Sequence, residues 1–297
     1  KASAVFMFAA WLTQRPARIY LAWGLRLETA KGPERAILWI AEKLTIILST
    51  SVLAVSPSLQ DKLRQIKLDS HRKVSVLGAG SSKGVDLGKY RPAKNSEQAE
   101  LGRLARSLNL VPGVPVIGMF GRISEDKGVE MMRRARRILA VNQIDHQLLV
   151  IGQNELEGQA DWGHHPRLRP PIVCSYQVDL SPYYRLLDAF CLPTRREGLP
   201  NVCLEAAASG IPVVATDATG SIDAVVHKTT GLTVSVNSSS ELFTALKNLI
   251  ENNPLRLRLG SAARIWVTKR YSEGDVVAGY MRYFDAVSVP LGKKKNL

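Results

Sequence analysis

The chain has little cysteine for its length. Its 297 residues include Cys174, Cys191 and Cys203, an odd number that forms no Cys-x-x-Cys pair. Each of the three lies among apolar residues, which favours buried, reduced thiols over a metal or redox site. Reduced thiols are typical of a reducing compartment.

Long apolar runs are also missing. The longest covers residues 4–12, well short of the about 18 residues that a membrane-spanning helix needs. It lacks the charge and cleavage layout of a signal peptide. The chain begins with Lys1 rather than Met, from which we expect a fragment of a longer protein.

Several ligand-binding patterns do not occur. No Asp-x-Asp appears anywhere in the chain, so nothing predicts a metal held by carboxylates. His164 and His165 lack metal-ligand spacing, which favours a surface loop. The glycines at 78, 80 and 84 have the wrong spacing for a dinucleotide fingerprint and lead into a linker instead of a helix.

Positive charge, by contrast, is in excess. The net charge is +14, and residues 1–112 supply +10 of it, with 18 Lys and Arg against 8 Asp and Glu. Such a surface attracts nucleic acid, anionic lipid or diphosphate ligands, and charge alone does not choose among them. The basic residues are not interleaved with aromatics and form no nucleic-acid motif, so we predict no nucleic-acid partner. Four arginines between residues 133 and 137 are expected to form the solvated face of a helix.

Helices and strands alternate along nearly the whole chain. We predict helices over 3–13, 33–48 and 57–66 and strands over 18–23, 52–55 and 73–77, followed by a Gly-, Ser- and Lys-rich loop over 78–88. This loop is the candidate linker between two lobes. The first lobe then covers residues 1–90, joined by a C-terminal helix over 273–289, and Lys293, Lys294 and Lys295 form a solvated tail.

The second lobe covers residues 91–272 and reads as a regular alternation. Strands are predicted over 114–120, 147–151, 172–176, 189–192, 212–216 and 232–236, and helices over 128–141, 201–209, 239–250 and 254–267. Short apolar strands alternating with helices predict a parallel, doubly wound α/β sheet. Ligands of such sheets bind at the carboxyl ends of the strands.

One candidate site lies directly after the strand at 114–120. It reads Gly-Arg-Ile-Ser-Glu-Asp-Lys-Gly over residues 121–128 and opens a helix. Free backbone N–H groups and the helix dipole favour an anion at such a junction. Arg122 offers a planar fork and Lys127 a mobile charge, both suited to phosphate oxygens. A surface turn with two solvated cations is the alternative.

A second candidate site follows the strand at 189–192. Glu197 lies in the loop, and Glu205 sits eight residues later, inside a helix of small and apolar residues. A carboxylate on the buried face of that helix is costly unless it is paired. A vicinal diol could donate two hydrogen bonds to it, and a structural salt bridge is the alternative.

Together these segments resemble glycosyltransferase family 4, whose motifs are a Gly-Arg-x(4)-Lys-Gly turn and a Glu-x(7)-Glu run followed by a Gly-rich turn. Here that turn covers residues 219–223, and residues 52–56, 84–86 and 90–92 match the family's interdomain region. The sequences Arg-Glu-Gly-Leu-Pro-Asn and Gly-Ser-Ser-x-Gly-Val-Asp look most like the subgroup that builds capsule, O-antigen or other lipid-linked oligosaccharides. The resemblance covers nearly the whole chain and implies a GT-B fold of two Rossmann-like doubly wound domains, the first incomplete.

The resemblance also implies roles for particular residues. Arg122 and Lys127 would hold the donor diphosphate and stabilise the charge that leaves. Glu197 would contact sugar hydroxyls near the reacting carbon, and Glu205 would bind the ribose diol. The remaining predicted contacts are backbone positions that line the sugar and phosphates: Gly121, Gly198, Leu199, Gly220, Ser221 and Ile222. Two cations and a helix N-terminus would replace a metal, so no cofactor is expected besides the nucleotide-sugar co-substrate.

Two departures from the family qualify this prediction. Trp23-Gly24 stands where many members carry His-Gly, so a histidine contact to the donor sugar is missing. The family's opening strands and Gly-rich acceptor loop would precede Lys1, so we expect an N-terminally truncated first lobe with exposed strand edges. A non-catalytic, nucleotide-sugar-binding remnant is therefore an alternative, as is another GT-B enzyme such as a sugar epimerase or phosphorylase.

The predicted function is that of a retaining, metal-independent hexosyltransferase. Its donor would be a nucleotide-diphosphate sugar, and a UDP-sugar is expected first. The sugar would pass to a lipid-linked or polysaccharide acceptor in bacterial surface glycan synthesis. The basic first lobe fits peripheral contact with anionic membrane. We expect the protein in the cytoplasm, at the inner face of the plasma membrane.

Overall fold

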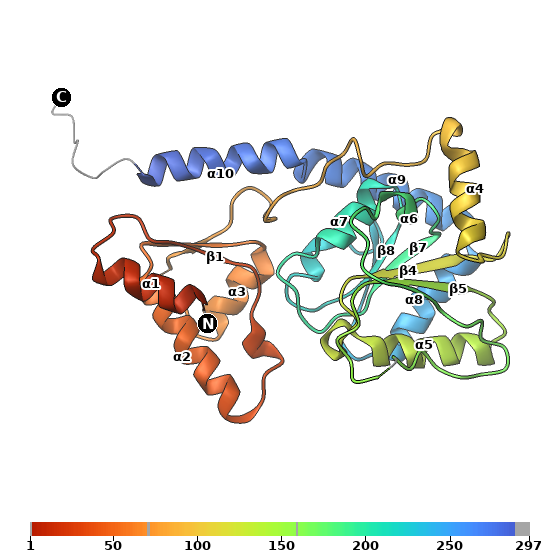
Figure 1. Ribbon diagram of the computed structural model, residues 1–297, viewed down its shortest axis with the longest axis horizontal. Helices are drawn as coiled ribbons and strands as arrows, with labels where there is room; N and C mark the ends of the chain where they lie inside the picture. Colours follow the sequence, from red (N-terminus) through yellow and green to blue (C-terminus); the bar gives the residue numbers. More distant parts are fainter. Residues whose placement is uncertain (1, 70–71, 159, 289–297) are drawn as a thin grey trace.

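The protein folds as two lobes, each built on its own parallel sheet (Figure 1). A computed structural model describes residues 2–69, 72–158 and 160–288. The first sheet has the order β1-β2-β3 and the second the order β6-β5-β4-β7-β8-β9. All strand pairs in both sheets are parallel, as the α/β alternation predicts.

The first lobe combines β1 (Ile19–Ala22), β2 (Ser51–Ala54) and β3 (Val74–Ser75) with α1 (Ala2–Leu12), a short 3₁₀ turn η1 (Arg26–Glu28), α2 (Gly32–Leu48) and α3 (Pro57–Gln65). Pro57 begins α3, and the Ser56 hydroxyl accepts a hydrogen bond from the Leu59 N–H, which satisfies one free donor of the first turn. The predicted helices agree with these bounds to within one residue. The strand expected over 73–77 was predicted too long, because only two of its residues pair with β2.

Residues 76–94 lead to the second lobe, where sequence reasoning missed two helices, one at its start and a short one over residues 181–184. After the 3₁₀ turn η2 (Asn95–Glu97), the chain forms α4 (Gln98–Ser107) before the first strand. Glu97 fastens this segment through ion pairs with Arg91, at 2.8 Å, and Arg185, at 3.3 Å. These two arginines lie far apart in sequence, so no local pattern indicates the anchor.

The second lobe has a closed core on both faces of its sheet. Its strands are β4 (Val116–Phe120), β5 (Gln147–Ile151), β6 (Ile172–Cys174), β7 (Ala189–Leu192), β8 (Val213–Thr216) and β9 (Gly231–Val234). Its helices are α5 (Val129–Val141), α6 (Ser181–Tyr184), α7 (Asn201–Ala208), α8 (Ser239–Glu251) and α9 (Asn253–Arg270). Neighbouring residues of β4 enter opposite cores, Ile117 that of α5 and α8 and Val116 that of α7 and α9 (Figure 1), because side chains alternate along a strand.

The arginine cluster on α5 corrects one expectation. Arg136 is fully buried and not part of a solvated face. Its guanidinium donates hydrogen bonds to the carbonyl oxygens of Trp162, at 3.0 Å, and Arg169, at 2.7 Å, and to Nε2 of His146, at 3.3 Å. The long loop after β5 folds over α5 and supplies the two carbonyl acceptors, while His146 directly precedes β5, an arrangement that the helix pattern alone does not reveal.

Burial and the neighbouring guanidinium make His146 a neutral residue. Its Nε2 accepts from Arg136, and Nδ1 lies 3.0 Å from the Ile144 carbonyl oxygen, so the tautomer protonated on Nδ1 fits both contacts. Burial lowers the pKa of His146 to about 4, and the positive charge of Arg136 acts in the same direction. Protonation of this ring would place a second cation in the core.

The last helix, α10 (Glu273–Ser288), extends from the second lobe back along the first (Figure 1). The Glu273 N–H donates to the Val85 carbonyl, and the Tyr280 hydroxyl donates to the Ser81 carbonyl at 3.0 Å. The rest of the helix predicted over 273–289, the lysine tail at 293–295 and His71 lie outside the described residues. No helix in the described part of the chain is long and apolar enough to cross a membrane.

The burial predicted for the cysteines is confirmed for Cys191 and Cys203 and holds only in part for Cys174. All three are free, and Cys191 and Cys203 are buried while Cys174 is half-buried.

Candidate functional site

The turn between β4 and α5 is held in place by a glycine. Gly128 has a left-handed backbone, with φ of 82°, and a Cβ at this position would overlap the Pro193 carbonyl after β7. Only glycine combines that conformation with so close an approach. The turn is therefore pressed against the segment that carries Glu197, and the short 3₁₀ element η3 (Glu125–Lys127) directs Lys127 toward it.

Lys127 and Glu197 form an ion pair at the centre of the site. Lys127 Nζ contacts Glu197 Oε1, and both side chains are 15% exposed. The pair lines a pocket of about 230 Å³ at the carboxyl ends of β4 and β7. Four other predicted or adjacent residues share its wall: Gly121, Arg122, Leu199 and Asn201.

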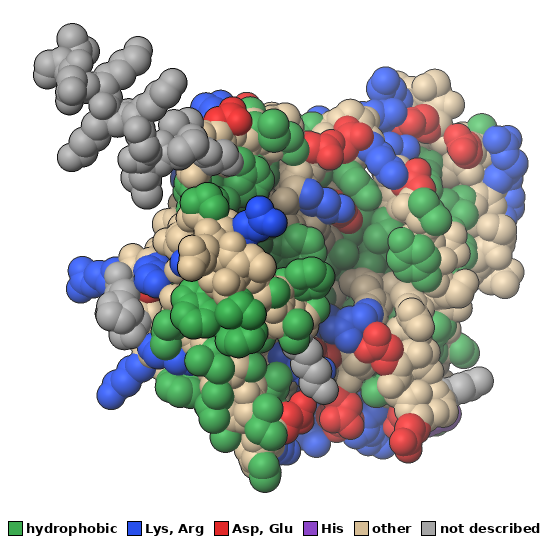
Figure 2. Space-filling model, turned by 60° about the vertical axis from the view of Figure 1, so that its left-hand side comes forward, with side chains coloured by type: hydrophobic (Ala, Val, Ile, Leu, Met, Phe, Trp, Pro, Cys, Tyr) green, Lys and Arg blue, Asp and Glu red, His purple; other side chains and the backbone are tan. Residues whose placement is uncertain are grey.

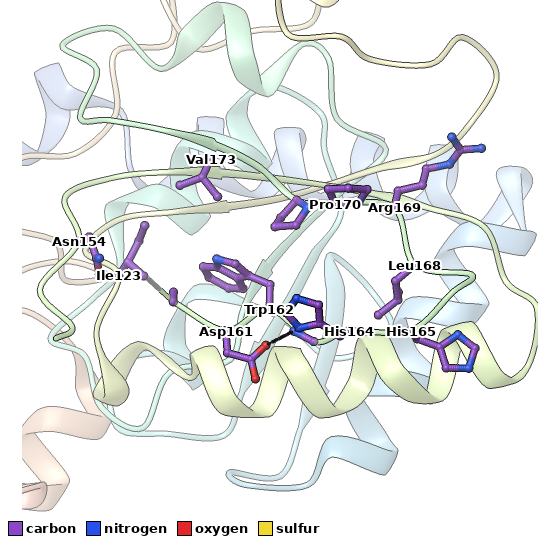
Figure 3. A pocket seen from close by; sticks show the side chains of 13 residues that line it. Ile123, Asn154, Asp161, Trp162, His164, His165, Leu168, Arg169, Pro170 and Val173 are labelled. Carbon is purple, nitrogen blue, oxygen red and sulfur yellow. Dashed lines mark hydrogen bonds and ion pairs between the residues drawn. The ribbon is translucent and has the colours of Figure 1, made fainter. Parts of the chain in front are cut away.

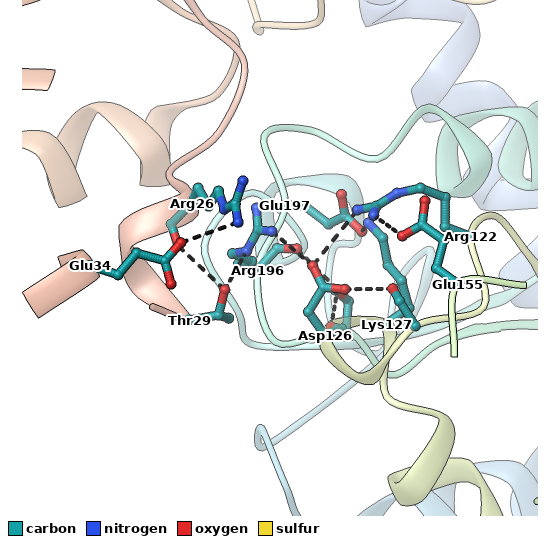
Figure 4. Close-up of polar contacts among 11 residues, drawn as sticks. Arg26, Thr29, Glu34, Arg122, Asp126, Lys127, Glu155, Arg196 and Glu197 are labelled. Carbon is teal, nitrogen blue, oxygen red and sulfur yellow. Dashed lines mark hydrogen bonds and ion pairs between the residues drawn. The ribbon is translucent and has the colours of Figure 1, made fainter. Parts of the chain in front are cut away.

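Arg122 lies at the outer side of this pocket, 47% exposed, and pairs with Glu155 at 2.6 Å (Figure 4). It also approaches Asp126 at 3.8 Å. Burial alone would raise the pKa of Asp126, but a hydrogen bond from Ser124 and the charges of Arg196, Lys127 and Arg122 outweigh it and lower that pKa. Asp126 thus stays ionised among the cations.

Glu205 lies on α7, apart from the pocket's lining residues, and is 5% exposed. The Tyr184 hydroxyl donates to Oε2 at 3.2 Å, and Lys83 Nζ lies 3.7 Å from Oε1. Burial raises the pKa of Glu205 despite the opposing charge of Lys83. The structural salt bridge considered from sequence is therefore present, and contact with a ribose diol stays a prediction.

The remaining predicted residues lie where the two lobes meet. A Cβ at Gly198 would overlap the Trp23 carbonyl, and the Ser56 hydroxyl donates to the Gly198 carbonyl at 2.6 Å. The Gly220 N–H donates to the Ser58 hydroxyl at 2.6 Å. Gly198 and Gly220 therefore hold the lobes in contact beside the pocket.

The Gly220 turn continues this contact. Asp223 accepts hydrogen bonds from the backbone and the hydroxyl of Ser58. Ile222 is 43% exposed, and the buried hydroxyl of Ser221 has no hydrogen-bond partner in the described part of the chain. The structure thus brings Ser221 close to the first lobe without using its hydroxyl.

A polar bridge crosses from the first lobe to the turn between β4 and α5. Arg196 donates to the Thr29 hydroxyl at 2.9 Å and pairs with Asp126 at 2.9 Å (Figure 4). Nearby, the Thr219 hydroxyl donates to Glu28 at 2.7 Å. Lobe contact is thereby linked to the turn that carries Arg122 and Lys127.

Sequence reasoning missed the residues that make these contacts. Asp126 lies in the Gly-Arg-x(4)-Lys-Gly turn, and Arg196 directly precedes Glu197. Nothing in the spacing of these two residues indicates that their side chains meet. The others come from the first lobe or its linker and carry no motif signal for a contact so distant in sequence: Glu28, Thr29, Ser56, Ser58 and Lys83.

Two larger cavities lie beside the predicted site. One of about 600 Å³ is bordered by Ile123, Trp162, His164 and Arg169 (Figure 3), and the His164 side chain is 99% exposed, as expected for a surface loop. The other, of about 670 Å³, opens between the lobes next to Thr29. Among the described residues, no group of three or more His, Cys, Asp or Glu could hold a metal ion.

Solved structures with the same architecture define the class. The chain superposes with a TM-score of 0.78 on Anabaena Alr3699/HepE, solved in complex with UDP-glucose, at 20% identity over 96% of this chain and 76% of that one. Two parallel α/β lobes that meet at the strand ends are the GT-B fold of glycosyltransferases.

Sequence relatives give the family. Residues 114–252 match the family model described as glycosyl transferases group 1. The capsular polysaccharide biosynthesis glycosyltransferase CapM of Staphylococcus aureus is 35% identical over 275 residues, covering 92% of this chain and 71% of CapM. D-inositol 3-phosphate glycosyltransferase of Jonesia denitrificans is 28% identical over 90% of this chain and 65% of its own length. The chain belongs to the glycosyl transferases group 1 family, a family of transferase enzymes.

Proposed function

We propose that this glycosyltransferase moves a hexose-type sugar from a UDP-sugar to a lipid-linked or polysaccharide acceptor, with retention of anomeric configuration. One observation carries the proposal: the pocket at the strand ends joins Gly121, Arg122, Lys127, Glu197 and Leu199 in a single wall. It offers two cations and the start of a helix to a diphosphate, beside a carboxylate that can accept from sugar hydroxyls.

The reaction follows from these positions. The bond between the anomeric carbon and the diphosphate oxygen breaks, and Arg122 and Lys127 stabilise the negative charge that develops on the departing group. The acceptor hydroxyl forms the new bond on the same face of the sugar. Its proton passes to an oxygen of the departing phosphate, so that the products are a glycoside and UDP.

The other site residues bind and orient in this proposal. Glu197 contacts sugar hydroxyls, and Glu205 receives hydrogen bonds from the ribose diol in place of its contact with Lys83. The backbone at Gly198 and Leu199, together with Gly220, Ser221 and Ile222, encloses the sugar and phosphates. Trp23 takes the place of a histidine at the carboxyl end of β1, so no imidazole contacts the sugar there.

Charge stabilisation is proposed to need no metal. Arg122 and Lys127 supply the positive charge that a divalent cation supplies in other transferases. The rate should therefore stay the same when EDTA replaces magnesium in the assay. A rate that depends on added Mg²⁺ or Mn²⁺ would contradict this part of the proposal.

The acceptor is proposed from the relatives and from charge. CapM takes part in capsular polysaccharide biosynthesis by name, which supports a glycan acceptor in bacterial surface synthesis. The +10 charge of residues 1–112 supports an acceptor carried on anionic membrane. We place the protein in the cytoplasm, at the periphery of the inner membrane face.

The test begins with the donor. A thermal-shift panel of UDP-glucose, UDP-galactose, UDP-N-acetylglucosamine and GDP-mannose should show stabilisation by a UDP-sugar, since ligands that bind the folded state raise its stability. Incubation of that donor with lipid-linked acceptors, followed by NMR of the product, should show a glycoside with the donor's anomeric configuration. Epimerised donor without a glycoside would instead indicate an epimerase, and binding without any turnover a non-catalytic nucleotide-sugar-binding protein.

A further inference from the structure

The loop after β5 continues the pairing of β4 and β5 beyond the ends of both strands. The Ile123 N–H donates to the Gln153 carbonyl at 2.8 Å, and the Glu155 N–H donates back to the Ile123 carbonyl at 3.0 Å. A Cβ on Gly152 would overlap the Gly121 carbonyl, so the two segments lie this close only because residue 152 is glycine. The backbone of Glu155 is therefore held in register with the turn after β4.

A local turn fixes the chain just past Glu155. The Leu156 N–H donates to Oδ1 of Asn154 at 3.0 Å, and Nδ2 of Asn154 donates to the Gly158 carbonyl at 2.7 Å. Asparagine commonly closes a turn in this way, through side-chain bonds to the backbone that follows it. Glu155 thus lies between a backbone ladder and a hydrogen-bonded turn, and both fix the point from which its side chain extends.

The carboxylate of Glu155 contacts Arg122. Its Oε2 accepts from Nη1 of Arg122 at 2.6 Å (Figure 4). Asp126 also approaches this guanidinium, but only to 3.8 Å, and it pairs more closely with Arg196, at 2.9 Å. Glu155 is therefore the carboxylate that holds the Arg122 side chain more closely.

This contact is made from outside the pocket at the strand ends. The pocket of about 230 Å³ is lined by Arg122 and not by Glu155. A guanidinium offers five N–H donors in a rigid fork, so the contact at Nη1 leaves other donors for an anion in the pocket. Lys127 is placed differently, since its partner Glu197 lines the pocket as well. Glu197 can contact a ligand itself, whereas Glu155 can act on it only through Arg122.

Two effects of the Glu155 carboxylate on a bound diphosphate oppose each other. Its negative charge repels phosphate, but Glu155 is 38% and Arg122 47% exposed, and solvent and salt screen charges that are so exposed. Its contact with Nη1 restricts, before any ligand arrives, a side chain that otherwise has large rotamer freedom. A guanidinium that is oriented in advance loses less freedom on binding. We expect orientation to outweigh repulsion.

We propose that Glu155 is a positioning residue, which orients the Arg122 guanidinium toward the diphosphate of the donor without touching the donor itself. The inference rests on the proposed function, in which Arg122 binds that diphosphate. Loss of the Glu155 carboxylate then weakens binding of the diphosphate and leaves binding of the nucleoside unchanged. Glu155 lies outside both quoted motifs, 33 residues after Arg122.

The test measures the affinity of each variant for UDP and for uridine by isothermal titration calorimetry. Glu155→Ala should bind UDP about fivefold more weakly and should bind uridine, which has no phosphate, like the unsubstituted chain. Glu155→Gln keeps an oxygen that can accept from Nη1 and should lose only about twofold, because a neutral amide accepts more weakly than a carboxylate. Glu157→Ala removes an exposed carboxylate from the same loop and should bind both ligands normally.

The same change in an Arg122→Gln background tests whether Glu155 acts through the arginine. Arg122→Gln alone should weaken UDP binding by at least about tenfold. Adding Glu155→Ala should then cost less than about twofold, because both changes remove the same contact. A fivefold loss that persists in this background would overturn the proposal and would assign Glu155 to the structure of the loop.

Two other results would also overturn the proposal. Tighter UDP binding by both Glu155 variants would make repulsion the larger effect, and an equal loss of uridine affinity would mean that the loop itself is disturbed. UDP binding that is unchanged in Arg122→Gln would contradict the proposed function, on which the inference rests. A loss in Arg122→Gln with none in Glu155→Ala would contradict the positioning role alone.

Discussion

In the second lobe, β4, β5, β7 and β8 are buried at every position, whereas β1 of the first lobe is only half-buried along three of its four residues. Helices cover both faces of the larger sheet. The first lobe instead exposes nine large apolar side chains on α1 and α2. The second lobe thus buries its apolar residues in its own core, whereas α1 and α2 leave many of theirs exposed in the described part of the first lobe (Figure 2).

The largest effect is expected when a positive charge is removed from the polar site of the second lobe. Lys127→Ala or Arg122→Ala should reduce turnover by about 10²-fold to 10³-fold, because each deletes a group aimed at developing charge. Thermal unfolding should change little, since neither side chain belongs to the apolar core. Initial-rate assays with the UDP-sugar that stabilises the protein most in the thermal-shift panel would measure the loss.

Lys269→Ala is the matched control, since it removes an exposed lysine at the end of α9. Turnover that is unchanged in both Lys127→Ala and Arg122→Ala would mean that neither side chain takes part in the reaction. It would contradict the assignment of the reactive site to the second lobe.

The second prediction concerns the pH dependence of stability. The pKa of His146 is lowered from 6.5 to about 4 in the folded protein, so the unfolded chain binds more protons between these values. Its contribution to the free energy of unfolding is present above pH 6.5 and is lost as the pH falls, by up to about 3 kcal/mol. Urea titrations of the intact chain and of His146→Gln between pH 7 and 4 would measure it.

The difference between the two pH profiles should appear in the unfolding of the second lobe, where the ring lies. A profile that is unchanged by His146→Gln would show that the buried ring does not set this dependence.

A smaller effect is expected where the lobes meet. Thr29→Val removes the hydroxyl that accepts from Arg196, so the closed arrangement loses about 1 kcal/mol. The apparent KM for the donor should rise by less than about twofold, because most of the protein stays in the closed, binding-competent arrangement, while kcat changes less. Steady-state kinetics separate the two constants.

Thr268→Val, on the exposed part of α9, should leave both constants unchanged. A fall in kcat alone in Thr29→Val would mean that the bridge acts on the chemical step and not on closure.

The smallest effect is predicted on the exposed apolar face of α2. Ile37→Thr alters a side chain that is 65% exposed and should change the free energy of unfolding by less than about 0.5 kcal/mol. Val141→Thr, at 64% exposure in the second lobe, is its control. Chemical denaturation would compare them, and a cost for Ile37→Thr well above that of Val141→Thr would mean that this face is covered in solution.

Local patterns were sufficient for much of the second lobe. Its strands are short apolar runs with β-branched residues, so β4 and β5 could be located to within two residues, and the glycines of the turn after β4 marked a junction that needs them. The buried position of Arg136 could not be predicted in this way, because its two carbonyl acceptors come from a loop more than 25 residues away. The exposed apolar residues of α2 show another limit of local patterns. Their periodicity reveals an apolar face on the helix but does not reveal what covers that face.

The candidate site likewise has one part that could be predicted from the sequence and one part that could not. The pocket that joins Lys127 and Glu197 could be expected from two motifs at neighbouring strand ends. The bridge from Thr29 through Arg196 to Asp126 could not, because it depends on how two separately folded lobes meet.

The contacts between the lobes also set a time scale. Five polar links join them beside the pocket: Thr29–Arg196, Glu28–Thr219, Ser56–Gly198, Ser58–Gly220 and Ser58–Asp223. At about 1 kcal/mol each, these links add several kcal/mol to the apolar contacts of the core that the lobes share, and all of them must break before the lobes separate. Domain motions of this kind occur in microseconds to milliseconds. Entry of the donor would then depend on how often the lobes separate, and so on hydroxyl groups far from the reacting carbon.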